Sequence, residues 1–305
     1  MNNKTPTITI AICTYNRAHY LTLCLESLRD GIKKYPEIDV LVVDNNSCDT
    51  TSQVCSQFKE QGMPLRYVLE KKQGIAHGRN TAYMEATGYY VAYIDDDAKA
   101  LVDYVDRLVA TATKCDYDCF GGMYYAYFET KRPKWLPDGF GTKKNISEKR
   151  EVIATGFLSA GNFICKREVL EKIGGFDTAL GMFGTKVGYG EEDDVQHKMR
   201  VEGYQVAWDP KLGVDHVVAK RKLKLGWQID YIYKQNRDII LNHNPYNSFA
   251  KVVREFIKIA FKYTPRYVLK FLREKEYYWQ NLYIAVVGSY ARVLGAYNNK
   301  NSFSE

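Results

Sequence analysis

Short apolar runs alternate with amphipathic segments through the first third of the chain. Buried parallel strands are apolar along their whole length, because helices cover both faces of such a sheet. Four short runs that are mostly apolar are predicted as strands: Thr7–Cys13, Asp39–Val43, Leu65–Leu69 and Tyr89–Ile94. The segments between them favour helices, namely the one holding Leu21, Leu25 and Leu28, then Thr50–Gln61 and Gly74–Thr87. This alternation predicts an open, mostly parallel α/β sheet flanked by helices.

The pattern is less regular between residues 100 and 153. Lys131–Lys144 contains Pro133, Pro137 and several glycines, and is typical of a long loop. Regular elements return later, with a strand over residues 160–166, a helix over Glu191–Glu202 and a strand over Tyr204–Trp208. We therefore expect one α/β domain over residues 1–225, followed by a helical appendage over residues 226–305.

Charge is distributed unevenly along the 305 residues. The net charge is +7, and residues from Ala250 to the end contain ten Lys/Arg and four Asp/Glu. Nearly all the excess thus lies in the last fifth of the chain. This favours an anionic partner for the tail and argues against a general nucleic-acid-binding protein.

The tail also has an apolar stripe at helical spacing, which includes Val253, Ile257 and Phe261 with cations interleaved. One interpretation of residues 250–300 is an interfacial helix on an anionic membrane surface. The other is a helix packed on the α/β domain with a solvated basic face. Both interpretations stay open at this stage.

Cysteine usage and hydropathy indicate the compartment. The seven cysteines are odd in number and form no CxxC pair, which favours a reducing environment. No signal peptide is apparent, and the uncharged stretch Tyr277–Ala291 is too short and polar to span a bilayer. We expect a cytoplasmic protein. The alternative is peripheral attachment to the inner face of the cell membrane.

Acidic residues follow two of the predicted strands. Asp44 ends one strand, and Asp95, Asp96 and Asp97 follow another. Ligands of parallel α/β sheets bind beyond the carboxyl ends of the strands. Three consecutive aspartates repel one another unless a cation lies among them, and carboxylate oxygens favour Mg²⁺ or Mn²⁺. The alternative is a solvated acidic turn.

A second acidic cluster, Glu191–Asp194, begins a predicted helix after Gly190. Crowded carboxylates include members with a raised pKa, which suits a general base. Helix capping is the alternative, since the helix dipole stabilises acids in the first turn. His216 has no other histidine or cysteine near it in the sequence. Two roles for His216 stay open, a structural one and that of a metal ligand.

Nucleotide-binding motifs of the common kinds are absent, since neither GxGxxG nor a Walker A sequence follows the first strand. Asp44 lies where an acid can bind a base or a ribose hydroxyl. Gly74–Asn80 (GIAHGRN) is a glycine-rich helix start, and Arg79 in it can bind diphosphate oxygens in a bidentate manner.

Several segments in order resemble a family 2 glycosyltransferase with the GT-A fold, over roughly residues 6 to 220. They are TITIAICTYNR, VVDNNSCD, GIAHGRNTA, YIDDDA, SAGNFICKREVLEKIGGFD, GYGEEDD and then His216. Each motif is weak alone, and the ordered set is strong.

The resemblance implies roles for the matching positions. Thr14, Tyr15 and Arg17 border the nucleotide, Asp44 binds the base, and Arg79 lies near uracil or phosphate. Asp95 and Asp97 match the outer acids of a DXD motif, in which Asp95 touches ribose or metal and Asp97 holds the metal. His216 matches a histidine that in some relatives completes the metal shell. The cofactors implied are Mn²⁺ or Mg²⁺ and a nucleotide-diphosphate sugar, with UDP-sugar as the first choice.

The family pattern places the catalytic base at Glu192, where an aspartate is expected, and Asp193 serves instead if the helix starts one residue later. The implied reaction is inverting sugar transfer to a hydroxyl of a glycan or lipid-linked acceptor. A sugar-phosphate nucleotidyltransferase is the alternative enzyme, although TYNRAHY lacks that class's glycine- and lysine-rich loop. A non-catalytic sugar-nucleotide-binding protein would have a broken acidic motif, and both motifs are intact.

Overall fold

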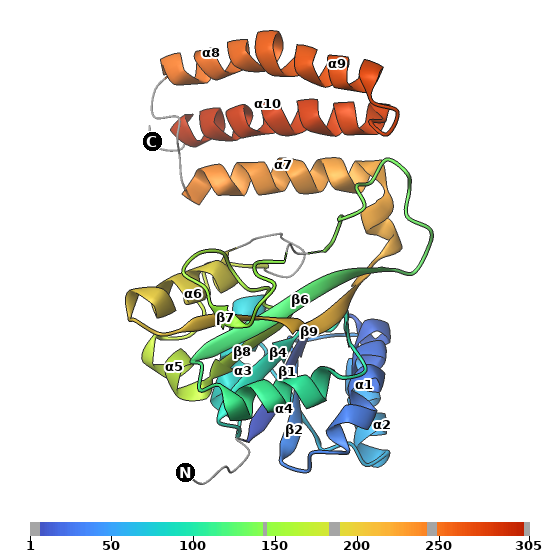
Figure 1. Cartoon of the computed structure of the whole chain (residues 1–305), viewed down its shortest axis with the longest axis vertical. Helices are drawn as coiled ribbons and strands as arrows, with labels where there is room; N and C mark the ends of the chain where they lie inside the picture. The colour runs from blue at the N-terminus through green and yellow to red at the C-terminus, as the bar shows by residue number, and fades with distance from the viewer. Residues whose placement is uncertain (1–6, 143–144, 183–189, 243–248, 302–305) are drawn as a thin grey trace. The chain divides into compact units, whose positions relative to one another are not determined.

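The computed structural model describes residues 7–142, 145–182, 190–242 and 249–301. The chain divides into two compact units. The sheet unit comprises Met1–Tyr127 and Gly141–Val217, and the helical unit comprises Phe128–Phe140 and Val218–Glu305. The functional boundary expected at residue 225 stays a prediction. Figure 1 shows the elements of both units.

The sheet unit is built on a mixed sheet whose strands lie in the order β3-β2-β1-β4-β8-β6-β9-β5, with β7 paired to β9. The strands are β1 (Ile8–Thr14), β2 (Ile38–Asp44), β3 (Leu65–Leu69), β4 (Tyr90–Ile94), β5 (Ala98–Ala100), β6 (Cys119–Phe128), β7 (Glu151–Val152), β8 (Asn162–Lys166) and β9 (Val206–Val218).

The parallel half of the sheet, β3-β2-β1-β4, contains the four strands that the apolar runs predict. Thr14 at the end of β1 is in register with Asp44 at the end of β2. The prediction of a mostly parallel sheet is thereby confirmed for this half, and the carboxyl ends of these strands form one edge.

The antiparallel half was not predicted in detail. β8 pairs with β4 and β6 in antiparallel fashion. β6 lies in the segment that the sequence left irregular, because Gly121 and Gly122 interrupt its apolar pattern. A Cβ at Gly122 would lie 2.0 Å from the Leu212 carbonyl oxygen, so neighbouring backbone excludes any side chain there.

Helices cover both faces of the sheet. Ile8, Ile10 and Ile12 of β1 belong to one apolar core with α1 and α4, and Ala11 belongs to the other with α3, α5 and α6. This division follows from the alternation of side chains along a strand. The helices are α1 (Ala18–Ile32), α2 (Thr51–Glu60), α3 (Ile75–Glu85), α4 (Tyr104–Lys114), α5 (Arg167–Lys172) and α6 (Glu191–Val201).

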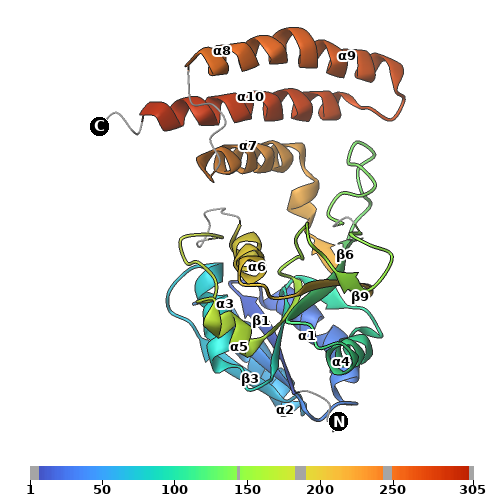
Figure 2. The ribbon, with the colours of Figure 1, turned by 60° about the vertical axis from the view of Figure 1, so that its left-hand side comes forward.

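The helical unit contains η1 (Lys220–Leu223), α7 (Leu225–Asn242), α8 (Phe249–Lys258), the π-helical turn η2 (Ile259–Tyr263), α9 (Thr264–Arg273) and α10 (Trp279–Asn301). α10 lies between α7 and the α8–α9 pair (Figure 1 and Figure 2). Within the described ranges, no helix is both long and apolar enough to cross a membrane.

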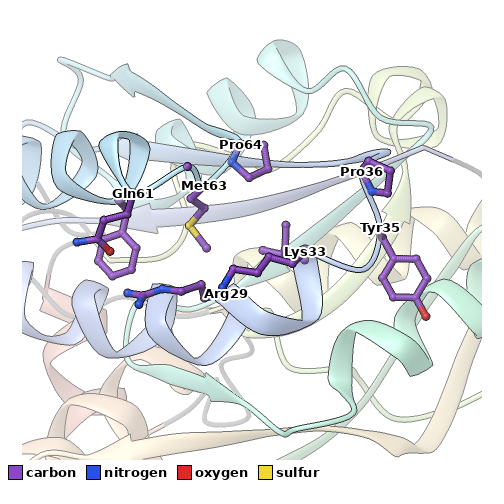
Figure 3. Close-up of a pocket in the computed structure, with 10 residues that line it drawn as sticks. Arg29, Lys33, Tyr35, Pro36, Gln61, Met63 and Pro64 are labelled. Carbon is purple, nitrogen blue, oxygen red and sulfur yellow. The ribbon is translucent and has the colours of Figure 1, made fainter.

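A surface pocket lies at the amino ends of β2 and β3, between the C-terminal turns of α1 and α2 (Figure 3). Its lining includes Arg29, Lys33, Tyr35, Phe58 and Met63. No carboxylate lines it, and it lies at the sheet edge opposite the acidic strand ends. The residues drawn as sticks in Figure 3 are therefore not part of the acidic site.

Candidate active site

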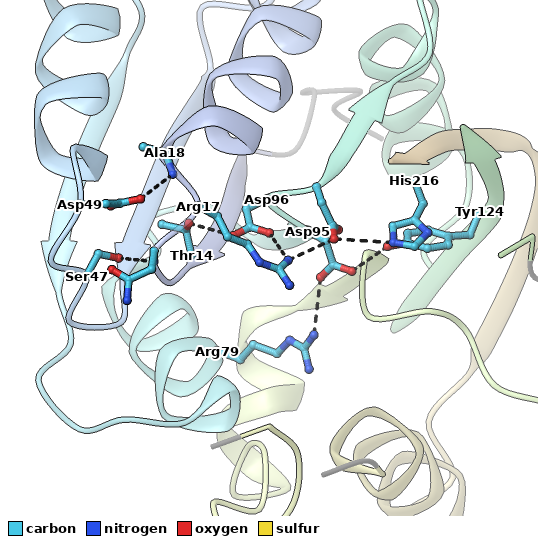
Figure 4. A network of polar contacts seen from close by, with 12 residues as sticks. Thr14, Arg17, Ala18, Ser47, Asp49, Arg79, Asp95, Asp96, Tyr124 and His216 are labelled. Carbon is cyan, nitrogen blue, oxygen red and sulfur yellow. Dashed lines mark hydrogen bonds and ion pairs between the residues drawn. The ribbon is translucent and has the colours of Figure 1, made fainter. Parts of the chain in front are cut away.

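The three consecutive aspartates form the turn between β4 and β5. The turn is fixed by two backbone hydrogen bonds, since Ala98 N donates to the Asp95 carbonyl at 3.0 Å and Val217 N donates to the Asp97 carbonyl at 2.7 Å. Asp96 and Asp97 are 4% and 8% exposed. The acids thus stand on a rigid turn at the predicted sheet edge (Figure 4).

Arg17 supplies a cation among these aspartates. Its Nη1 lies 2.9 Å from Asp96 Oδ1 and 3.0 Å from Asp97 Oδ2, and Thr14 Oγ1 donates to Asp96 Oδ2 at 2.8 Å. Burial raises the pKa of the Asp96 carboxyl to about 6, against the opposing effect of Arg17. Asp96 in turn raises the pKa of Arg17 above its usual range. Two residues predicted to border the nucleotide are therefore tied to the acidic turn.

Asp95 is held by residues that the sequence did not single out. Tyr124 of β6 donates its hydroxyl to Asp95 Oδ2 at 2.8 Å. A Cβ at Gly161 would lie 2.3 Å from the same oxygen, so only glycine allows this carboxylate position. Burial raises the pKa of Tyr124 well above its usual value, which keeps the phenol a donor. Gly161 belongs to the SAGN motif of the sequence, but only the packing explains why a glycine is required at this position.

Arg79 of α3 is buried and joins two acidic segments. Its Nη1 lies 2.6 Å from Glu191 Oε1, and its Nη2 lies 3.6 Å from Asp95 Oδ1. Burial alone lowers the pKa of Arg79, but Glu191 and Asp95 more than offset this and the pKa is raised. In this structure the guanidinium is occupied by these carboxylates, and its role at uracil or phosphate stays a prediction.

The four acids in the first turn of α6, Glu191–Asp194, differ in their exposure to solvent and in their partners. Gly190 precedes it with φ 102°, a conformation that favours glycine. Glu191 is buried, Glu192 half-buried, Asp193 exposed, and Asp194 pairs with Lys198 at 2.7 Å. The buried Gln196 anchors the helix through hydrogen bonds with the backbone of Leu158. Either Glu192 or Asp193 is thus accessible for a base.

His216 lies on β9 directly opposite Ala98 of β5. Its Nε2 is 3.6 Å from Asp97 Oδ2, and its ring stacks on Tyr124 with centroids 4.9 Å apart. The fold therefore brings together two residues predicted as metal ligands from positions 119 residues apart.

The described residues contain no set of three His, Cys, Asp or Glu side chains arranged to hold an ion by themselves. Mg²⁺ and Mn²⁺ ordinarily keep waters and bind substrate phosphates beside one or two protein ligands. The Asp97 and His216 pair fits the protein's share of the ligands of an ion of that kind. Asp95 adds a second carboxylate on the same turn.

The predicted nucleotide end of the site lies at β1 and β2. Asp44 accepts hydrogen bonds from Ser47 N at 2.8 Å and from the Tyr67 hydroxyl at 2.7 Å. Gly74 precedes α3 with φ 133°, and its N–H donates to Asn45 Oδ1 at 2.8 Å. Tyr15 is half-buried. Asp44 is thus preoriented, and Tyr67 is a partner that the sequence pattern did not identify.

The chain matches known glycosyltransferases in sequence and in fold. Residues 9–174 match the family model described as glycosyl transferase family 2, which is more than half of the chain. The glycosyltransferase GlyA of Streptococcus pneumoniae is 27% identical over 177 residues, 54% of this chain but only 25% of GlyA. The succinoglycan biosynthesis protein ExoM of Rhizobium meliloti is 26% identical over 230 residues, 74% of this chain and 72% of ExoM.

Among solved structures, the mannosyltransferase PcManGT from Pyrobaculum calidifontis, in complex with GDP-Man and Mn²⁺, superposes with a TM-score of 0.62. It is 20% identical, and the match covers 95% of this chain and 88% of PcManGT. This likeness shows a shared fold, the GT-A fold. On the family match and this fold, the chain is a member of glycosyl transferase family 2.

Proposed function

We propose that this glycosyltransferase moves a sugar from a nucleotide-diphosphate sugar to an acceptor hydroxyl, with inversion at the anomeric carbon. The observation that carries the proposal is the pairing of Arg79 with both Asp95 and Glu191. It joins the DXD-like turn to the acidic helix, so groups suited to the donor diphosphate and to proton abstraction share one site.

The donor end of the proposal uses β1, β2 and the aspartate turn. Asp44 is assigned to binding of the nucleobase. The residues that border the nucleotide are Thr14, Tyr15, Arg17 and Gly74. We propose a UDP-sugar, although PcManGT binds GDP-Man. Asp97, Asp95 and His216 would hold Mn²⁺ or Mg²⁺, which when bound supplies positive charge at the departing diphosphate.

The protein's own groups account for the remaining chemistry. Glu192 takes the proton from the acceptor hydroxyl, and Asp193 is the second candidate for this base. Arg17 contributes charge stabilisation beside the leaving group. Because the aspartate turn and α6 are locked through Arg79, donor and acceptor are held in one orientation, which supplies proximity.

The acceptor proposal follows the relatives' biology. ExoM is named for succinoglycan biosynthesis, and we propose a role in polysaccharide or glycoconjugate synthesis with a glycan or lipid-linked acceptor. The proposed location is the cytoplasm, with peripheral attachment to the inner face of the cell membrane.

Product analysis tests the reaction. Purified protein is incubated with UDP- and GDP-sugars, Mn²⁺ and a panel of glycan acceptors, after a thermal-shift screen has selected the donors that raise the melting temperature. Release of free nucleoside diphosphate together with a glycosylated acceptor supports the proposal. A parallel incubation with UTP or GTP and a sugar 1-phosphate that releases pyrophosphate and forms the nucleotide sugar identifies a nucleotidyltransferase instead. Donor binding without any product identifies a non-catalytic binding protein.

A further inference from the structure

Large apolar side chains lie exposed along the continuous helical segment α8-η2-α9. Val253, Ile257 and Phe261 follow one another at intervals of four residues, and Phe261 is 81% exposed. In α9 the exposed apolar residues include Leu269 and Leu272, the latter 71% exposed. Within the described part of this segment the apolar side chains therefore form a stripe that its own unit does not cover.

The inner side of the same segment is occupied separately. Ile259 packs with Val293 of α10, and Phe256 and Tyr290 lie with ring centroids 5.8 Å apart. The exposed stripe is thus additional to the apolar surface that holds the helices together. Leaving such side chains in water is unfavourable unless another surface covers them.

A row of cations accompanies the stripe. Arg254, Lys258 and Lys262, then Arg266 and Lys270, each follow at an interval of four residues. Each lies one position after the row that starts at Val253, so on a helix the cations flank the apolar residues. Between Phe249 and Arg273 the chain has seven Lys/Arg and one acidic residue, Glu255, which pairs with Lys258.

We propose that this face, defined by Ile257, Phe261 and Leu272 with Lys262, Arg266 and Arg273, docks on an anionic lipid bilayer. An apolar stripe flanked by cations suits an interface with apolar chains below and phosphate headgroups beside it. A second copy of the chain is disfavoured as occupant, because it would bring two cation rows together with almost no acids to offset them. The inference concerns attachment and is independent of the transfer reaction.

The test is co-sedimentation of the full chain with phosphatidylcholine vesicles, with and without phosphatidylglycerol, at low and high salt. The wild type pellets with anionic vesicles at low salt and is released at high salt. Replacing the three apolar residues, Ile257→Ser, Phe261→Ser and Leu272→Ser, lowers the partition coefficient by at least about tenfold. Replacing the three cations, Lys262→Gln, Arg266→Gln and Arg273→Gln, lowers it by about a hundredfold at low salt, at roughly fivefold per cation.

Matched controls are taken from exposed positions of the sheet unit. Neither set changes vesicle binding: the apolar set is Met84→Ser, Val102→Ser and Val201→Ser, and the charge set is Lys59→Gln, Lys71→Gln and Lys114→Gln. Circular dichroism confirms that each variant is folded, and nucleotide affinity in the presence of Mn²⁺ is measured in parallel, so failure of attachment is distinguished from failure of the active site.

Three results overturn the inference. One is equal pelleting of wild type and the apolar variant, and another is equal wild-type binding to neutral and anionic vesicles. The third is a wild-type dimer in sedimentation velocity, without vesicles, that Phe261→Ser converts to a monomer, since the stripe is then the interface between two copies.

Discussion

The two units use charge in opposite ways. At the acidic edge of the sheet, Arg79 is 5% exposed and lies between Glu191 and Asp95. At the C-terminal end of α9, the Lys270 and Glu274 side chains are 47% and 56% exposed and their charged atoms are 3.6 Å apart. Buried charges each need a specific partner, whereas exposed charges interact weakly with any one partner and act as a set.

The difference teaches where single substitutions are informative. In the sheet unit, one side chain holds one geometry, and its removal leaves a buried group uncompensated. In the helical unit, exposed cations such as Lys262, Arg266 and Arg273 lie along one segment and each contributes little. Catalysis requires fixed groups, and attachment to a fluid surface does not.

The largest effect is expected from Asp97→Ala. This change removes a carboxylate that lies beside His216 and is assigned to the metal, so it abolishes the Mn²⁺-dependent part of UDP binding while the fold persists. Isothermal titration with and without Mn²⁺ measures this, and Asp30→Ala, at a 92% exposed side chain, serves as the control. Unchanged Mn²⁺-dependent affinity for UDP in Asp97→Ala would contradict the proposal that Asp97 holds the metal.

Arg79→Met sharpens the comparison of buried and exposed pairs. It leaves Glu191 buried without its partner, and we expect a loss of about 3–5 kcal/mol in the free energy of unfolding. Lys270→Met breaks the exposed pair on α9 and is expected to cost less than about 0.5 kcal/mol. Urea titration monitored by circular dichroism measures both, and similar losses for the two variants would contradict the contrast.

Glu192→Gln tests the base. The amide cannot take a proton, so the transfer rate falls by about a hundredfold or more, with donor affinity retained. The exposed Asp193→Asn is the matched change one residue on. If Asp193→Asn loses activity and Glu192→Gln does not, the base is Asp193.

Tyr124→Phe removes one hydroxyl and keeps the ring that stacks on His216. Because that hydroxyl orients Asp95, we expect Mn²⁺-dependent nucleotide affinity to fall by about tenfold. Tyr127→Phe, at an exposed position of the same strand, is expected to leave the affinity unchanged. The same affinity for both variants and wild type would show that Asp95 does not depend on Tyr124.

The smallest effect is expected on the pH dependence of stability, from the exposed pair of Lys34 and Asp106 in the sheet unit. Hydrogen bonds from Lys34 and Tyr35 lower the pKa of Asp106. A lowered folded-state pKa gives stability that is present above the unfolded value, near pH 4, and is lost as pH falls through the folded value. Because the pair is exposed, the contribution is small after solvent screening. Asp106→Asn should remove this part of the acid dependence, measured as melting temperature from pH 6 to pH 2.

The parallel half of the fold and the edge carrying the site follow from the sequence. Strands buried on both faces are mostly apolar, so β1, β2 and β4 are visible as nearly continuous apolar runs, whereas Arg66 interrupts β3 at the end of the sheet. The residue after each run must lie at the ligand edge. Asp44 and the three aspartates were located in this way, and the GT-A fold expected from the ordered motifs is confirmed. The assigned chemical roles stay predictions.

The sequence by itself determined which segments form the parallel strands and which acids end them, because these depend on local patterns of apolar and polar residues. Only the tertiary structure decided which acids are buried and which partner each one has. Arg79 and Glu191 are 112 residues apart in sequence, and Thr14 and Asp96 are 82 apart. Tyr124 reaches Asp95 because β8 inserts antiparallel between β4 and β6. Such pairs are set by strand order and close packing, which no local pattern encodes.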